Sequence, residues 1–315
     1  MNRKTVKRKV NSQQINKIPE NFREIRERLA KGPKRTVAIA AAADSEAIEA
    51  ASLMIAEGVA ESVLVGEEEK IRKLARDAEL DLTGMQIIDE PDDAAAALVA
   101  ASLVREGKAD ILMKGLVNTS YFLKAVLDKE RGIRGEGLLS HLAVFEVPGQ
   151  PRLLFLTDGG MNTYPALDEK VKILKNALGA LHKLGIECPK VAALSANEVV
   201  NPKVTSSVDA DALAKMNASG EITGCIVEGP VALDVAISAE AAKHKGIKSR
   251  IAGETDLFLV PNIDAGNIMS KTLNYIAGAK MAGIILGAKA PIILVSRSDH
   301  AESKLNSLAL ACAMI

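Results

Sequence analysis

The sequence predicts an α/β fold with mainly parallel sheets, and three observations support this prediction. Short apolar runs rich in β-branched residues alternate with alanine-rich stretches of helical length. Several of these runs are apolar throughout, which is typical of strands buried on both faces of a parallel sheet. Small or polar residues follow nearly every run, as expected where strands end beside a ligand. With 315 residues, of which 48% are hydrophobic, the chain can form two such lobes.

The elements follow in order along the chain. In the first half we expect strands at 36–43, 62–65, 86–89 and 109–113, with helices at 44–56 and 92–105. After a proline-rich turn at 148–151, strands are expected at 153–157, 191–195, 225–228, 257–260, 283–286 and 292–295. Helices between successive strands imply parallel crossover connections. The turn near residue 150 indicates a lobe boundary.

The segment from residue 259 to residue 299 reads as strand, loop, helix and strands. Pro261 stops one strand, and the residues from Asp264 to Asn267 open a helix in which Met269, Leu273 and Ile276 follow helical spacing. The N–H groups at such a helix start can bind an anion. The final strand ends in Ser296, Arg297 and Asp299, and an arginine there suits a phosphate or an oxyanion.

Composition excludes several classes of partner. The formal net charge is zero, with 40 basic and 40 acidic residues, and there is no tryptophan, so neither nucleic acid nor an anionic membrane is an expected partner. No apolar run is long enough to span a bilayer. We interpret the basic cluster at residues 3–9 as a solvated helix or a frayed end rather than a targeting signal. Cys188, Cys225 and Cys312 are expected to be reduced thiols in a cytoplasmic protein, with the last two buried and none catalytic.

Polar and glycine residues at the predicted strand ends form a candidate ligand site. They are Lys114, Asn118 and Thr119; Asp158 and Asn162; Gly229 and Pro230; and Asn262, Gly266 and Asn267. Lys271 lies further along the helix that begins near Asn267, although Ser270 stands where a P-loop requires glycine. The sequence contains no HxH, HExxH or CxxC pattern, so no metal site is expected.

Several motifs resemble the phosphate acetyltransferase and phosphate butyryltransferase family. They are the PxxxAGN loop at 261–267, PIILVSR at 291–297, GPVALD at 229–234, MKGLVNT at 113–119, LLSHLAVFEVPG at 138–149, TDGGMN at 157–162 and LSANEVVNPKV at 194–204. They occur in family order, and only roughly the first thirty residues fall outside the resemblance. The resemblance implies two α/β/α lobes similar to isocitrate dehydrogenase, with the active site in the cleft between them. Residues 1–149 and 284–315 would form the first lobe, and residues 150–283 the second, which would also build a homodimer or a higher homo-oligomer.

The resemblance also implies a reaction. An acyl group passes reversibly between coenzyme A and inorganic phosphate, so acyl-CoA and phosphate are the expected partners, coenzyme A is a substrate, and no tightly bound cofactor is needed. Phosphate is itself the nucleophile, so the site must mainly position two anions and stabilise the oxyanion and departing thiolate. Ser296 and Arg297 match the family's active-site serine and arginine.

Two positions depart from the acetyl-transferring members. Ser303 stands where those members have an aspartate proposed as the base for the CoA thiol, so the nearest carboxylates are Asp299 and Glu302. These two could act as a base or could form a capping box at the start of the last helix. Ser140 and its neighbours replace a family arginine beside His141, which could be a site residue or a structural one.

Three functions from different classes remain open at this point. A phosphate acyltransferase of the butyryl-preferring branch is favoured, with a phosphate acetyltransferase as its near alternative. A metal-dependent decarboxylating dehydrogenase on the same type of fold would need several converging aspartates, for which Asp209 and Asp211 are a weak candidate pair. A non-catalytic protein that binds CoA or acyl phosphate would fit the altered positions Ser140 and Ser303.

Overall fold

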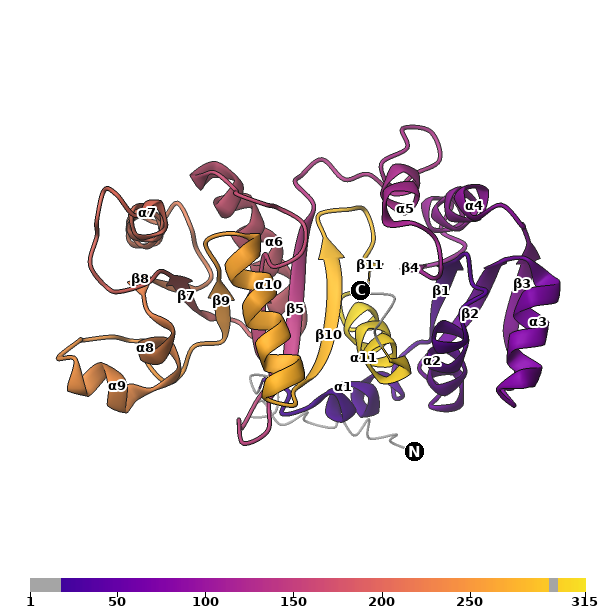
Figure 1. The fold of residues 1–315 in the computed structure, drawn as a ribbon, viewed down its shortest axis with the longest axis horizontal. Coiled ribbons are helices and arrows are strands. Elements are labelled where there is room, and N and C mark those ends of the chain that lie inside the picture. Colours follow the sequence, from indigo (N-terminus) through magenta and orange to yellow (C-terminus); the bar gives the residue numbers. More distant parts are fainter. Residues whose placement is uncertain (1–17, 295–299) are drawn as a thin grey trace, which may run out of the picture.

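A computed structural model describes residues 18–294 and 300–315, and its central feature is one mixed sheet. Its strands are β1 (Arg35–Ala40), β2 (Ala60–Gly66), β3 (Met85–Asp89), β4 (Ile111–Lys114), β5 (Ser140–Glu146), β6 (Leu154–Thr157), β7 (Lys190–Leu194), β8 (Ile226–Val231), β9 (Leu257–Leu259), β10 (Lys280–Leu286) and β11 (Ile292–Ile293). Their order across the sheet is β3, β2, β1, β4, β11, β10, β5, β6, β9, β7, β8. The molecule is therefore elongated, with β3 and β8 toward opposite ends (Figure 1).

Most helices connect consecutive strands. They are α1 (Phe22–Leu29), α2 (Ser45–Ala56), α3 (Glu68–Asp77), α4 (Asp93–Arg105), α5 (Thr119–Val126), α6 (Leu167–Lys183), α7 (Thr205–Ser219), α8 (Leu233–Ile237), α9 (Ala239–His244), α10 (Ile263–Lys271) and α11 (Ala301–Cys312). Side chains of Asp44, Asp92, Asn118 and Asn262 cap the N–H groups that begin α2, α4, α5 and α10.

Two parallel sets of strands are joined by antiparallel ones. The first set contains β3, β2, β1, β4 and β11, and the second contains β6, β9, β7 and β8. Between them, β10 pairs antiparallel with both β11 and β5, and β5 pairs antiparallel with β6. The prediction of a mainly parallel α/β fold is confirmed. The antiparallel junction makes the sheet continuous across the whole molecule.

The C-terminal elements return to the N-terminal half of the chain. Strand β11 pairs with β4, and α11 packs against α1, α2 and β10 (Figure 1). A buried ion pair strengthens this contact, because Nζ of Lys304, whose side chain is 2% exposed, lies 2.9 Å from Oδ2 of Asp44. The division into lobes at residues 149 and 284 stays a prediction.

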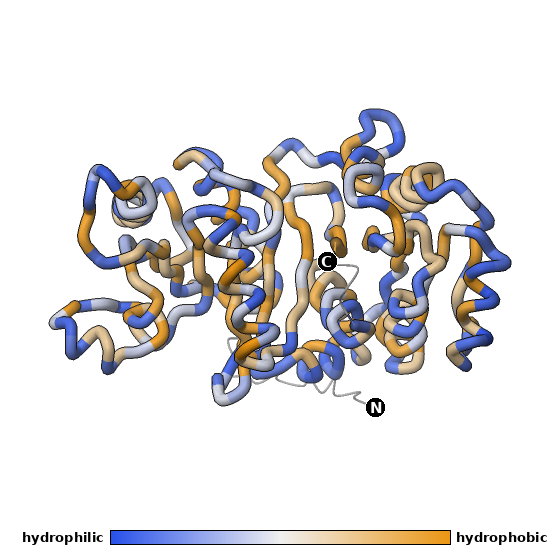
Figure 2. The backbone as a smooth tube through the Cα atoms, viewed as in Figure 1, coloured by the Kyte–Doolittle hydropathy of each residue, from blue (hydrophilic) through white to orange (hydrophobic). Residues whose placement is uncertain are grey.

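Apolar clusters cover both faces of the sheet. One large cluster runs along one face beneath α1, α2, α6 and α11. The opposite face carries two clusters, one with α4 and α5 over the first parallel set and one with α8, α9 and α10 over the second. Figure 2 shows apolar strands inside the molecule and a largely hydrophilic α3 at one end.

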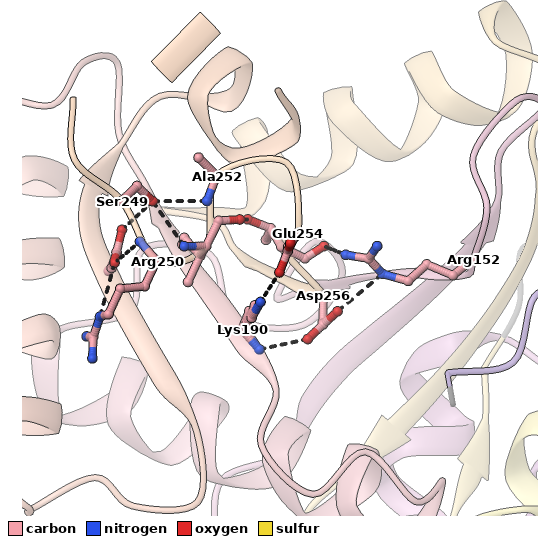
Figure 3. Close-up of polar contacts among 10 residues, drawn as sticks. Arg152, Lys190, Ser249, Arg250, Ala252, Glu254 and Asp256 are labelled. Atoms are coloured by element: carbon pink, nitrogen blue, oxygen red, sulfur yellow. Dashed lines mark hydrogen bonds and ion pairs between the residues drawn. The ribbon is translucent and has the colours of Figure 1, made fainter. Parts of the chain in front are cut away.

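A polar network ties together the starts of three strands in the second half. Nε of Arg152, just before β6, lies 3.3 Å from Oδ1 of Asp256, just before β9 (Figure 3). Oδ2 of Asp256 accepts a hydrogen bond of 2.8 Å from the backbone N–H of Lys190, which begins β7 and whose ammonium pairs with Glu254. Burial raises the pKa of the Asp256 carboxyl, and the neighbouring cations oppose this shift.

Two local predictions need correction. The helix expected to place Ile276 on its apolar face changes at Thr272 to a π-helical turn, Thr272–Ile276, which alters the spacing and leaves Ile276 83% exposed. The strand expected to start at Gly283 begins at Lys280 instead, so the glycine lies within it. The basic cluster at residues 3–9 lies outside the described residues.

The cysteines behave as the sequence indicates. Cys225 and Cys312 are buried, Cys188 is exposed, and all three are free thiols. Burial raises the pKa of Cys225 to about 11 and that of Cys312 to about 12. Across residues 18–294 and 300–315, we find no helix with the length and apolar character that crossing a membrane requires.

Candidate functional site

A cavity of about 150 Å³ lies beside α10, where β5 and β10 pair. Its lining comes from five segments and comprises His141; Gly159 and Gly160; Asn267, Ser270, Lys271 and Asn274; Met281, Gly283 and Ile285; and Leu294. Three of the predicted site residues, His141, Asn267 and Lys271, therefore meet here although they are far apart in the sequence. The cavity lies between the two apolar clusters of this face, since Leu294 packs against one and Met281 against the other.

The imidazole of His141 is held between two glycines. A Cβ atom at Gly160 would lie 3.0 Å from its Cγ, and a Cβ atom at Gly283 would lie 2.9 Å from its Nε2. Any side chain at Gly283 would thus push the ring out of place, and one at Gly160 would crowd it. The half-buried ring lies in the cavity wall, where it can exchange a hydrogen bond with a bound ligand.

Asp158 organises the loop that carries Gly160. It is 2% exposed and accepts four hydrogen bonds: Oδ1 from the N–H groups of Gly160 and Met161, and Oδ2 from the N–H of His141 and from Nδ2 of Asn162. The distances range from 2.6 to 3.1 Å. In this structure Asp158 is engaged by the protein itself and positions the loop against β5.

Helix α10 approaches this loop through a second glycine contact. A Cβ atom at Gly266 would lie only 2.6 Å from Cα of Gly159, so only glycine permits this packing. Asn262 begins the helix, with its Oδ1 accepting the N–H of Ala265 at 3.0 Å. The close approach brings Asn267 and Lys271, one turn apart, to the cavity.

Two further side chains complete the α10 side. The hydroxyl oxygen of Ser270 is buried and has no hydrogen-bond partner among the described residues. Nδ2 of Asn274, on the π-helical turn, lies 3.2 Å from Sδ of Met281. Nζ of Lys271 lies 5.5 Å from the centroid of the exposed Tyr275 ring. The wall formed by α10 is therefore rich in hydrogen-bonding groups.

The predicted residues after β4 form a neighbouring group. Lys114 is 3% exposed and donates a hydrogen bond of 3.2 Å from Nζ to the carbonyl of Gly115. The last register pair of β4 and β11 joins Met113 to Ile293, so the residues that follow, Lys114 and Leu294, are neighbours. Asn118 caps α5, and Thr119 is its first residue. A buried lysine thus follows the strand next to one lining residue of the cavity.

Other predicted residues lie apart from the cavity. Ser140 faces α6, where its hydroxyl accepts a hydrogen bond of 2.9 Å from Asn176. Gly229 and Pro230 lie on β8, at the far edge of the sheet. Asn162 Nδ2 is shared between Asp158 and the carbonyl of Leu139. Ser296, Arg297 and Asp299 fall outside the described residues.

The start of α11 differs from the expected capping box. The N-cap residue is His300, and the N–H of Ala301 is bound by a carboxylate oxygen of Glu46 at 2.6 Å. Glu302 instead forms an ion pair of 2.6 Å with Lys280, and this hydrogen bond is the main cause that raises the pKa of Lys280. Glu302 therefore contacts β10 through an exposed ion pair.

The acidic pair considered for a metal site is also occupied. Asp209 pairs with the buried Lys170 at 2.6 Å, and Asp211 pairs with Lys215 at 2.6 Å. Within the described residues, no group of three histidine, cysteine or acidic side chains could hold a metal ion.

Several cavity residues were not predicted from the sequence. Met281, Gly283 and Ile285 reach the cavity because β10 pairs antiparallel with β5, which places Ile285 opposite His141. The sequence shows that these three residues alternate along an apolar strand. It does not show that this strand pairs with β5, which is distant in the sequence. A larger cavity of about 580 Å³ lies beside Arg152 and Asp256 and contains none of the predicted residues. The smaller cavity is the candidate site, because three of the predicted residues converge there.

Comparisons with known proteins agree over nearly the whole chain. The family model described as "Phosphate acetyl/butaryl transferase" matches residues 21–97 and 92–312. The phosphate butyryltransferase of Clostridium acetobutylicum is 47% identical over 292 residues, which cover 93% of this chain and 97% of that protein. The phosphate acetyltransferase of Thermotoga maritima is 42% identical over 283 residues, covering 90% and 96%. A crystal structure of a branched-chain phosphotransacylase from Enterococcus faecalis superposes with a TM-score of 0.78 at 34% identity, covering 89% of this chain and 98% of that one.

Proposed function

This chain belongs to the phosphate acetyl/butyryltransferase family and is a phosphate acyltransferase, and we propose that it prefers short acyl groups of about four carbons. The observation that carries this preference is the 47% identity to a protein named phosphate butyryltransferase over 93% of the chain. The apolar part of the cavity gives it independent support. Acyl-CoA and inorganic phosphate would be the substrates, and acyl phosphate and CoA the products.

The reaction needs positioning and charge stabilisation. A phosphate oxygen attacks the thioester carbon, the carbonyl oxygen becomes an oxyanion, and the carbon–sulfur bond then breaks to release the CoA thiolate, which takes up a proton. We assign Arg297, with Ser296, to the phosphate or the oxyanion. His141 and Asn267 line the cavity where their N–H groups could bind the thioester or phosphate oxygens.

Lysines would supply further positive charge for the two anionic substrates. Lys271 lines the cavity, and Lys114 lies beside Leu294 at its edge. Lys114 lies within the MKGLVNT motif of the family resemblance, and Lys271 lies four residues after the PxxxAGN loop. We place the active site here, between the halves of the molecule, because the two apolar clusters of this sheet face meet at the cavity.

Asp299 and Glu302 are the two carboxylates that could take the proton from the CoA thiol when the reaction runs from acyl phosphate to acyl-CoA. Glu302 pairs with Lys280 at 2.6 Å on the exposed surface, and it is not among the residues that line the cavity. We therefore favour Asp299 as the base, or a lowered thiol pKa in bound CoA, over Glu302.

The deciding experiment measures CoA release from acetyl-, propionyl-, butyryl- and isobutyryl-CoA with and without phosphate. We expect phosphate-dependent release that is fastest with the four-carbon chains. Arg297→Ala should lower kcat/KM by about 100- to 1000-fold, as for the loss of an oxyanion donor. Arg72→Ala, which removes an exposed arginine of α3, serves as the control. Near-normal kinetics in folded Arg297→Ala would remove that residue from the mechanism.

We also propose a cytoplasmic homodimer built mainly by residues 150–283. In support, this range carries many exposed large apolar side chains, namely Tyr164, Val199, Val200, Val208, Leu233, Ile237, Ile268, Tyr275 and Ile276. The free thiols of all three cysteines fit a reducing compartment. Sedimentation velocity should give a dimer, and a monomer at micromolar concentration would contradict this proposal.

A further inference from the structure

One wall of the cavity has no role in the chemistry described above. Met281, Gly283 and Ile285 alternate along β10 and therefore face the same side of the sheet. Leu294, which follows β11, extends this wall. The side formed by α10 is the polar one. The cavity thus has an apolar side, which the ring of His141 interrupts at Gly283, and a hydrogen-bonding side.

We propose that Met281, Ile285 and Leu294 form the acyl-chain pocket and that Met281 sets the longest chain accepted; this inference rests on the proposed function. A hydrocarbon chain gains about 0.8 kcal/mol for each CH₂ removed from water, so it will lie against the apolar wall. The thioester carbonyl must keep a hydrogen bond when buried, so it will face the α10 wall. With its hydrocarbon chain on the β10 side and its carbonyl on the α10 side, the acyl group binds in one orientation.

The volume of the cavity suits a short chain. It is about 150 Å³, and an apolar cavity of about that volume in another protein holds benzene, a molecule of six carbons. Part of this volume must hold the thioester and phosphate oxygens, and the remainder suits the three carbons beyond the carbonyl of a butyryl group. A chain much longer than six carbons does not fit unless a lining side chain moves.

Met281 is the lining side chain with room to change. Ile285 is 1% exposed and fixed by the surrounding core, and Gly283 is fixed by its contact with His141. Met281 is half-buried, and its sulfur lies 3.2 Å from Nδ2 of Asn274, at the junction of the two walls. Methionine is unbranched and adapts to its surroundings, so its replacement alters the length of the pocket without dismantling the core.

The test compares kcat/KM for acetyl-, butyryl- and hexanoyl-CoA, with phosphate, in two variants and a control. Met281→Phe fills the pocket and should lower the butyryl-to-acetyl ratio by about 10- to 100-fold, since each methylene in an apolar pocket discriminates by about 10- to 200-fold. Met281→Ala lengthens the pocket and should raise the hexanoyl-to-butyryl ratio. Met85→Phe changes a half-buried methionine on β3, at the far edge of the sheet, and should leave both ratios unchanged.

The possible results distinguish a failure of the proposed acyl-chain pocket from a failure of the proposed acyltransferase reaction. An active wild type whose ratios do not respond to either Met281 substitution overturns the pocket but leaves the proposed function standing. A wild type without phosphate-dependent CoA release from any acyl-CoA overturns the proposed function and the pocket with it. Thermal unfolding checks that each variant is folded, and if Met281→Phe is not, the ratio in Met281→Ala decides.

Discussion

Replacing Asp158 by asparagine tests whether its carboxylate holds the site loop to β5. The substitution keeps the size of the side chain but replaces one acceptor oxygen by an NH₂ group. Oδ1 accepts from Gly160 and Met161, and Oδ2 accepts from His141 and Asn162. In either orientation of the new amide, its NH₂ group faces two N–H donors, so two of the four hydrogen bonds are lost. Each hydrogen bond to a charged group contributes about 1.5 to 3 kcal/mol, so we expect Asp158→Asn to lower the free energy of unfolding by about 3 to 6 kcal/mol.

Rearrangement of the neighbouring side chains would recover little of the lost stability. Asn162 could rotate its amide to accept from the new NH₂ group, but its Nδ2 also donates to the carbonyl of Leu139 at 2.9 Å, and that bond would be lost. The N–H of His141 would still lack its acceptor. Some destabilisation should therefore persist in any arrangement of these side chains.

Urea unfolding followed by circular dichroism measures the effect. With a slope of about 3 kcal/mol per molar, the predicted loss corresponds to a fall in midpoint of about 1 to 2 M. Asp168→Asn, at the exposed start of α6, is the control and should leave the midpoint unchanged. An Asp158→Asn protein with the wild-type midpoint would refute the reasoning, because it would show that the four-donor arrangement does not depend on a carboxylate.

Two further predictions concern the C-terminal helix and the thiols. Lys304→Met leaves the half-buried carboxylate of Asp44 without its cation, so it should lower the free energy of unfolding by about 3 kcal/mol. Adding Asp44→Asn should restore part of the loss. Equal stability of the wild type and the Lys304→Met variant would contradict this prediction. Since burial raises the pKa of Cys225 to about 11 and of Cys312 to about 12, a thiol reagent at pH 8 should modify Cys188 quickly and the other two only after denaturation. Rapid modification of all three thiols in the native protein would show that these two cysteines are accessible.

The fold class could be predicted because its signals are local. The apolar runs and the capping residues, such as Asp44 before α2, lie within the elements that they define. His141, Asn267 and Lys271 could be selected as candidate site residues from the sequence, and all three line one cavity. The antiparallel pairing of β5 with β10 could not be predicted, because it joins residues far apart in the sequence and leaves no local mark. The π-helical turn after Lys271 was not predicted either, and it changes the helical spacing from which Ile276 was expected on the apolar face.

Gly283 shows why the sequence pattern misplaced the start of β10. Glycine weakens a strand interior, and the expected strand covered only residues 283–286, yet β10 extends three residues further toward its N-terminus. The missing side chain is what admits the ring of His141, whose Nε2 would lie 2.9 Å from a Cβ atom at that position. Gly160 does the same from the other side, and Gly266 allows α10 to approach the loop beside it. Gly283, which weakens the local signal for a strand, therefore also creates space for the candidate site.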